Sequence, residues 1–184
     1  VPHHAEINYD RSCLLPVLSI LHACSSGAVG TQQILRSRVT LMRVVAVMES
    51  IDTTDECLHE ALGLVKNLSY YAEDQRAFLL CLPRFLRSVG GIAAKTVLEK
   101  LLWRLSAFFR NLTGSSDCRS SHVETADVLG ALVRMSGLPD RAALRNILNT
   151  LISLSMDHES CVLLLQYGDG VLLNITKRLM RSCT

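Results

Sequence analysis

The stretch Val65-Lys66-Asn67-Leu68-Ser69 decides the fold class, because similar stretches recur along the chain at a nearly constant spacing. The others are Ile20-Leu21-His22-Ala23-Cys24-Ser25, Phe109-Arg110-Asn111-Leu112-Thr113 and Leu151-Ile152-Ser153-Leu154-Ser155. Aligned on their central polar residues, His22, Asn67, Asn111 and Ser153, these stretches lie 45, 44 and 42 residues apart. Periods of about 40–47 residues are typical of solenoids that stack two- or three-helix repeats.

Apolar residues between these stretches recur at helical spacing. Leu58, Ala61, Leu62, Val65 and Leu68 form one such stripe, whereas the strict alternation expected of strands is absent from the sequence. Short polar or glycine-containing breaks separate the stripes and predict turns between helices. These breaks are Ser25-Ser26-Gly27, Asp52-Thr53-Thr54-Asp55, Gly90-Gly91, Thr113-Gly114-Ser115-Ser116 and Ser136-Gly137-Leu138-Pro139. The pattern therefore predicts an all-α fold.

Each repeated stretch is followed by two further apolar segments. A short second helix is predicted over 31–35, 75–79, 119–123 and 161–165. A third helix is predicted over 41–47, 85–89, 128–135 and 171–180. Such three-helix units do not fold singly, because each unit buries its apolar faces against its neighbours.

Two segments carry a resemblance to a known family. The sequence from Ala61 to Leu79, and that from Leu148 to Val171, resemble armadillo repeats, a class close to HEAT repeats. Units of that family have a long helix ending in Asn-Leu-Ser, a turn, a short helix, a Gly and another apolar helix. The resemblance implies a right-handed α-solenoid of about four armadillo-like three-helix repeats. We expect one repeat domain over residues 1–184, and the start Val1-Pro2-His3-His4 favours a piece of a longer protein.

Composition narrows the function classes. Hydrophobic residues make up 49% of the chain and the mean hydropathy is +0.27, but no run of eighteen uncharged apolar residues occurs. A membrane span is therefore not expected. The formal net charge is only +2, which argues against nucleic acid and anionic membranes as partners.

Cysteine usage points to a reducing compartment. Seven cysteines are scattered at positions 13, 24, 57, 81, 118, 161 and 183, mostly within apolar runs. Zinc sites need clustered ligands and secreted disulfide frameworks usually have paired cysteines, so we predict buried thiols and no metal site. The expected location is inside the cell, in the cytoplasm or nucleus.

Sequence signatures of catalysis are missing. The chain contains no Gly-rich phosphate loop, Gly-x-Ser-x-Gly, His-Glu-x-x-His or Cys-x-x-Cys. We therefore expect neither a cofactor nor enzymatic activity.

The family resemblance implies a binding groove. In armadillo proteins the helices that end in the repeated stretch line a concave face, which holds an extended peptide. Asn67 and Asn111 match the family's asparagine, whose amide bonds the peptide backbone, while His22 and Ser153 hold this position in the outer units. The alternative is that each asparagine bonds the backbone of its own helix end.

Basic and aromatic residues lie on or beside the same helices. Lys66, Arg104 and Arg110 would favour an acidic or phosphorylated segment, unless they form only a solvated face. Trp103 lies two turns before the second asparagine. Gly63 stands where nuclear-import adaptors of the family carry a Trp, so basic localisation signals are not the expected ligand.

These observations favour a non-enzymatic scaffold that binds a protein or peptide segment through its solenoid surface. Two alternatives stay open at this point. One is a HEAT-like scaffold associated with nucleic acid, which the balanced charge disfavours. The other is a purely structural module that spaces or oligomerises its parent protein, including as a homo-oligomer.

Overall fold

The computed structural model describes residues 13–50, 52–71, 76–95, 99–114, 126–136, 140–166, 176–177 and 180–181. Within these ranges the regular secondary structure is helical and contains no strand, which confirms the predicted all-α class. The helices are α1 (Leu14–Cys24), α2 (Ala28–Arg36), α3 (Arg38–Glu49), α4 (Asp55–Tyr70), α5 (Arg76–Lys95), α6 (Glu99–Thr113), α8 (Ala126–Met135), α9 (Arg141–Ser155) and α10 (His158–Gln166).

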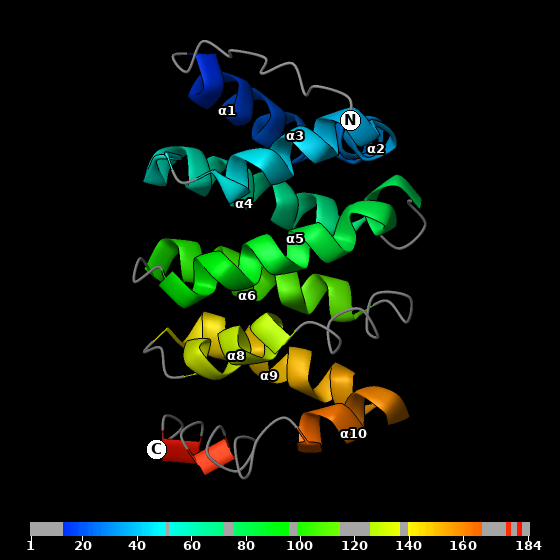
Figure 1. Ribbon diagram of the computed structural model, residues 1–184, viewed down its shortest axis with the longest axis vertical. Coiled ribbons are helices and arrows are strands. Elements are labelled where there is room, and N and C mark those ends of the chain that lie inside the picture. The colour runs from blue at the N-terminus through cyan, green and yellow to red at the C-terminus, as the bar shows by residue number, and fades with distance from the viewer. Residues whose placement is uncertain are drawn as a thin grey trace, which may run out of the picture.

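The helices stack along the long axis of the molecule in two layers (Figure 1). In the first, which we call layer A, α1 packs on α4, α4 on α6, and α6 on α9. In the second, layer B, α3 packs on α5 and α5 on α8. Helices about one sequence period apart are thus neighbours in space, which is the arrangement of a helical-repeat solenoid.

The first unit, α1–α2–α3, has the three predicted helices. Ser37 ends α2 in an extended conformation, and its hydroxyl accepts a hydrogen bond from the Thr40 amide at 3.3 Å, which caps α3. Thr54 caps α4 in the same way through the Cys57 amide, also at 3.3 Å. The turns predicted at 25–27 and 52–55 are confirmed.

The second unit differs from the prediction. The segments 75–79 and 85–89, expected as separate helices before a turn at Gly90-Gly91, belong to one helix of 20 residues, α5. Phe78, Phe85 and Gly90 are buried on it. Each glycine costs a helix only about 1 kcal/mol relative to Ala, and burying a large apolar face outweighs this. The predicted turn is therefore wrong, because tertiary packing overrides the local signal.

The remaining predicted helices are confirmed where they fall within the described ranges. The segment 128–135 lies in α8 and 161–165 lies in α10. Segment 119–123 and most of 171–180 lie outside the described residues. The turns at 113–116 and 136–139 begin where α6 and α8 end, and their remaining residues lie outside the described ranges.

The core lies between the two layers. Phe78 and Phe85 of α5 stack with ring centroids 5.2 Å apart, and Phe108 and Phe109 of α6 pack edge to face at 5.7 Å. All four rings are at most 1% exposed.

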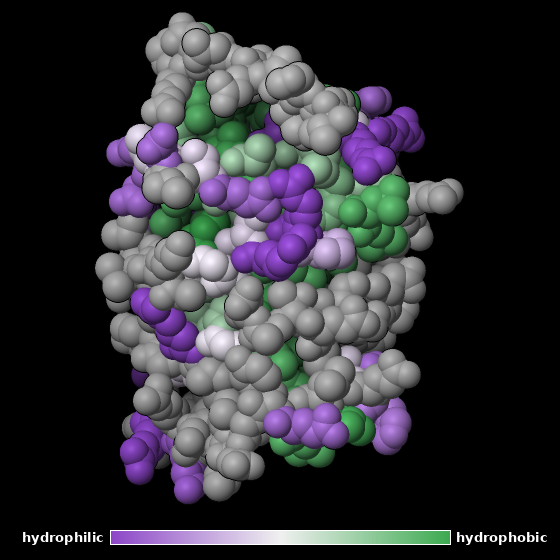
Figure 2. Space-filling model, in the orientation of Figure 1, coloured by the Kyte–Doolittle hydropathy of each residue, from purple (hydrophilic) through white to green (hydrophobic). Residues whose placement is uncertain are grey.

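Viewed as in Figure 1, hydrophilic side chains gather over α3 and α5 in the upper half of the surface, with apolar surface beside them (Figure 2). Among the described helices, none combines the length and apolar character that crossing a bilayer would require.

The prediction of buried thiols is only partly right. Cys57 and Cys81 are buried, and burial raises the pKa of the Cys81 thiol. Cys161 is half-buried, but Cys13 and Cys24 are exposed, because α1 is the first helix of layer A in the described structure and no neighbouring helix there covers its outer side. The cysteines at 118 and 183 lie outside the described residues.

Candidate functional site

Side-chain hydrogen bonds join successive helices of layer A. The Asn67 side-chain amide of α4 donates to Ser25 Oγ, just beyond the end of α1, at 3.0 Å. The Asn111 amide of α6 donates to Ser69 Oγ and to the Lys66 carbonyl oxygen of α4, both at 3.1 Å. These N–H groups therefore bond the neighbouring helix, rather than their own backbone as one alternative held.

These bonds correct the alignment of the first repeat. Each asparagine–serine pair spans 42 residues, so Ser25 and Ser69 are equivalent positions 44 residues apart. With this register, Ala23 is the counterpart of Asn67 in α1, and His22 is the counterpart of Lys66. The alignment of His22 with the asparagines was therefore out of register by one residue.

A cluster of basic groups lies over α4 and α6. The Lys66 ammonium sits 5.4 Å from the centroid of the Trp103 ring, within the range of a cation–π interaction. The Arg104 guanidinium donates to the His59 carbonyl oxygen of α4. Trp103 is 38% exposed, and Arg110 is exposed near the end of α6. We call Lys66, Trp103 and Arg104, together with His22, the basic cluster.

Gly63 makes room for two members of this cluster. It is buried in α4, and a Cβ at this position would overlap both the Arg104 guanidinium and the His22 ring. These side chains therefore approach the bare backbone of α4 from α6 and α1. The ring of His22 is held by a 2.8 Å contact between its Nδ1 and Glu60 Oε2.

The positive groups in this region are partly desolvated and crowd one another. Burial, followed by the charge of Arg104, lowers the pKa of the Lys66 amine. Burial also lowers the pKa of the Arg104 guanidinium, against the opposing effect of Glu60. The pKa of the His59 imidazole is lowered by burial first and then by Arg104, with Glu60 partly opposing the shift. An additional negative charge would stabilise these groups.

The structure brings together some of the predicted site residues and separates others. His22, Lys66, Trp103 and Arg104 form the basic cluster, and the two asparagines lie at the ends of the same helices. Arg110 occupies the position equivalent to Lys66 one repeat later. Ser153 is half-buried on α9, and within the described residues its side chain makes no hydrogen bond to this group.

Sequence reasoning missed several residues of this region. Glu60 and His59 were not singled out, nor was Asn146, whose buried amide donates to Ser106 Oγ of α6 at 3.2 Å. A signal for Glu60 exists, since it precedes Arg104 by 44 residues, the same interval that separates the two asparagines. An acid and a base at equivalent positions of adjacent repeats can lie close together.

The described part of the chain shows no grouping of three His, Cys, Asp or Glu side chains that could hold a metal ion. The chemistry available in the basic cluster is charge and hydrogen bonding, with no nucleophile–base pair among its members.

No protein-family model matches the chain, and no curated protein matches it in sequence. Among solved structures, a "Designed armadillo repeat protein YIII(Dq)4CqI" is similar, with a TM-score of 0.43 and 13% sequence identity. The match covers 96% of this chain and 96% of that protein. The repeat fold described above rests on the contacts between the helices themselves.

Proposed function

We propose that the chain is a non-enzymatic scaffold that binds an acidic or phosphorylated segment of a partner protein across layer A. The segment would lie over α1, α4 and α6, with the basic cluster at its centre. The observation that supports this proposal is the convergence of His22 and Arg104 on Gly63, beside Lys66. Among the described residues, Glu60 is the carboxylate in contact with this group, so positive charge exceeds negative charge among them.

An anionic group fits this place for an electrostatic reason. Burying cations costs free energy, which appears in the lowered pKa of Lys66 and of Arg104, and the charge of Arg104 adds to the cost at Lys66. A carboxylate or phosphate seated among them would form charge-assisted hydrogen bonds and remove part of this cost. Arg110, exposed one repeat further along, would extend the basic track.

Apolar anchors and backbone acceptors complete the surface. Trp103 is 38% exposed and Tyr70, at the end of α4, is 70% exposed, and large aromatic residues of this kind dominate many interfaces. Asn67 and Asn111 use their N–H groups between helices, but among the described residues neither side-chain oxygen accepts a hydrogen bond. We propose that these oxygens accept from the backbone N–H groups of the bound segment, and that Ser153 extends the same track over α9.

The test uses a variant that moves the cluster without changing its charge. Gly63→Ala displaces the Arg104 guanidinium and the His22 ring, whereas Gly91→Ala, in helix α5, adds a methyl group that meets nothing within 4 Å. We expect a fluorescein-labelled 12-residue peptide rich in Asp and Glu to bind the wild-type chain saturably. We expect Gly63→Ala to weaken this binding by about tenfold, and Gly91→Ala to leave it unchanged.

Three further ligands separate the alternatives. A Lys-rich peptide of the same length should not bind, and a serine-phosphorylated peptide should compete with the acidic one. A DNA duplex that binds better than either peptide would favour the nucleic-acid alternative instead. Equal acidic-peptide binding by wild type and Gly63→Ala would contradict the proposed site.

A further inference from the structure

The outer side of α1 carries an exposed stripe of small and apolar side chains. Cys13, at the N-cap of α1, Val17, Ile20 and Cys24 follow one another at spacings of four, three and four residues, which places them along one face of the helix. Val17 is 50% exposed and Ile20 is 63% exposed, and both cysteines are exposed. We call these four residues the α1 stripe.

The same positions are buried in each of the following helices of layer A. With the register fixed by the asparagine–serine bonds, the α1 stripe corresponds to one stripe in α4 and to one in α6. The equivalent residues are Cys57, Ala61, Leu64 and Leu68 in α4, Leu101, Leu105, Phe108 and Leu112 in α6, and, at the 42-residue spacing, Ala143, Ile147, Thr150 and Leu154 in α9. All twelve are at most 6% exposed.

The difference between α1 and these helices lies in what precedes each of them. The helices α4, α6 and α9 each pack against the preceding helix of the layer, whereas in the described structure α1 packs only on α4 within layer A. The α1 stripe is thus the surface that the stacking of layer A covers everywhere else. It continues an interface that the chain itself forms three times.

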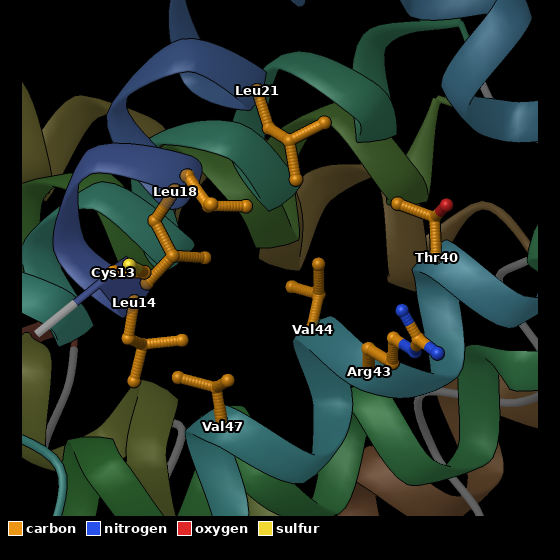
Figure 3. A pocket seen from close by; sticks show the side chains of 9 residues that line it. Cys13, Leu14, Leu18, Leu21, Thr40, Arg43, Val44 and Val47 are labelled. Atoms are coloured by element: carbon orange, nitrogen blue, oxygen red, sulfur yellow. The ribbon is translucent and has the colours of Figure 1, made fainter. Parts of the chain in front are cut away.

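A pocket lies beside this stripe. It has a volume of about 410 Å³ and opens between α1 and α3. Leu14, Leu18 and Leu21 line it from α1, and Val44 and Val47 line it from α3, with the side chains facing one another across the space (Figure 3). Figure 2 shows apolar surface at this end of the stack. The pocket and the stripe together form a surface suited to helix packing.

We propose that this end of the solenoid is a docking surface for an amphipathic α-helix of a partner protein. The helix lies parallel to α1 and packs on the α1 stripe as α1 packs on α4. Its apolar residues recur at i, i+4 and i+7, and a larger apolar side chain enters the pocket. This surface is distinct from the basic cluster and takes a different kind of ligand.

Symmetry favours a partner helix over a second copy of this chain. Successive helices of layer A run in the same direction, since Asn67 and Asn111 each bond the C-terminal end of the preceding helix. Two copies related by a two-fold axis would instead place the α1 stripe of one copy against the α1 stripe of the other. Within layer A each stripe packs against a different face of the preceding helix, so a dimer that pairs two identical stripes does not reproduce this packing.

The test uses a peptide with the sequence of α4, because α4 packs on α6, the helix that carries the next-but-one equivalent of the α1 stripe. A synthetic peptide with the sequence of α4, residues 55–70, carrying Cys57→Ser, is titrated into the whole chain. Binding is followed by the rate at which a maleimide labels Cys13 and Cys24, with half-buried Cys161 as the internal control. At a peptide concentration about ten times Kd, labelling of the stripe cysteines should slow by about tenfold while that of Cys161 stays unchanged.

Exposed residues supply matched variants that leave the core intact. Val17→Asp and Ile20→Asp place a charge on the stripe, and we expect each to weaken peptide binding by about tenfold or more. Val39→Asp puts the same charge on α3 at a position that is 63% exposed and does not line the pocket, and should leave binding unchanged. A peptide of the same composition with scrambled order should give no protection.

Several outcomes would overturn the proposal. No protection at millimolar peptide would show that the stripe does not dock a helix. Slow labelling of Cys13 and Cys24 in dilute protein without peptide would show that the chain itself covers the stripe. Protection that rises with protein concentration, together with a doubled mass by light scattering, would assign the surface to self-association.

Discussion

In layer A, neighbouring helices are joined by hydrogen bonds between buried or half-buried polar side chains, whereas in layer B the contacts between helices are mainly apolar. Asn67 and Asn111 bond the preceding helix through equivalent geometry. In layer B, α3 and α5 share a half-exposed ion pair between Glu49 and Arg84 at the surface. The directional bonds of layer A fix the register between repeats, while the buried side chains of layer B contribute mainly to stability.

We expect the largest loss of unfolding free energy when the apolar packing of layer B is disrupted. Phe85→Ala removes a fully buried ring that stacks on Phe78, and should lower the free energy of unfolding by about 3–5 kcal/mol in urea denaturation. Leu80→Ala on the same helix is the control, because Leu80 is 60% exposed and should cost about 0.5 kcal/mol or less. Equal effects of the two changes would contradict the assignment of the core.

Removing the side-chain hydrogen bonds of layer A should lower the free energy of unfolding by a smaller amount, which increases with the number of bonds removed. Asn111→Ala removes two hydrogen bonds and leaves Ser69 Oγ and the Lys66 carbonyl without this donor, which should cost about 1–2 kcal/mol of unfolding free energy. Asn67→Ala removes one bond and should cost about half as much. The same denaturation series measures both. A cost for Asn67→Ala that equals or exceeds that for Asn111→Ala would contradict the prediction that stability depends on the number of hydrogen bonds removed.

Weakening the surface ion pair of layer B should lower the free energy of unfolding by less than the loss of the Phe85 ring or of the asparagine hydrogen bonds. Glu49→Gln weakens the contact with the Arg84 guanidinium, and half-exposed pairs of this kind contribute only about 0–1 kcal/mol. The difference between variant and wild type should disappear in 1 M salt, where the Debye length is about 3 Å. A difference that persists at high salt would mean that the hydrogen bond from Ser88 to Glu49, at 3.3 Å, is the important contact.

The smallest effect is a pH dependence that belongs to layer A. Burial and the charge of Arg104 hold the pKa of His59 below its ordinary value of 6.5, so the unfolded chain binds a proton more readily than the folded chain. Stability should therefore decrease as the pH falls below 6.5, and the loss should level off once the pH is below the folded-state pKa. In His59→Leu, which also removes a buried ring nitrogen without a partner among the described residues, this part of the slope should vanish. An unchanged slope in thermal melts between pH 7 and pH 5 would contradict the prediction.

The sequence by itself determined the helical class, the repeat period and the helices on which the candidate residues lie. Stripes such as Leu58, Leu62 and Val65 have the periodicity of a buried helix face, and that periodicity is a local property of the chain. The position of Asn67 and Asn111 at corresponding helix ends also follows from spacing alone. The sequence also places Lys66, Trp103 and Arg104 on the helices that carry these asparagines.

Only the tertiary structure decided the register of the first repeat, the continuity of α5 and the convergence on Gly63. A spacing of 45 instead of 44 residues is within the variation of such repeats, so only the bond from Asn67 to Ser25 could distinguish His22 from Ala23 as the counterpart. Gly90-Gly91 has the sequence of a turn, but burial of α5 between α3 and α8 favours helix. The lack of a side chain at Gly63 makes room for His22 and Arg104 only because α1 and α6, two other parts of the chain, pack beside it. Contacts between repeats depend on side chains some 40 residues apart, and a local pattern cannot specify which of several adjacent positions will meet.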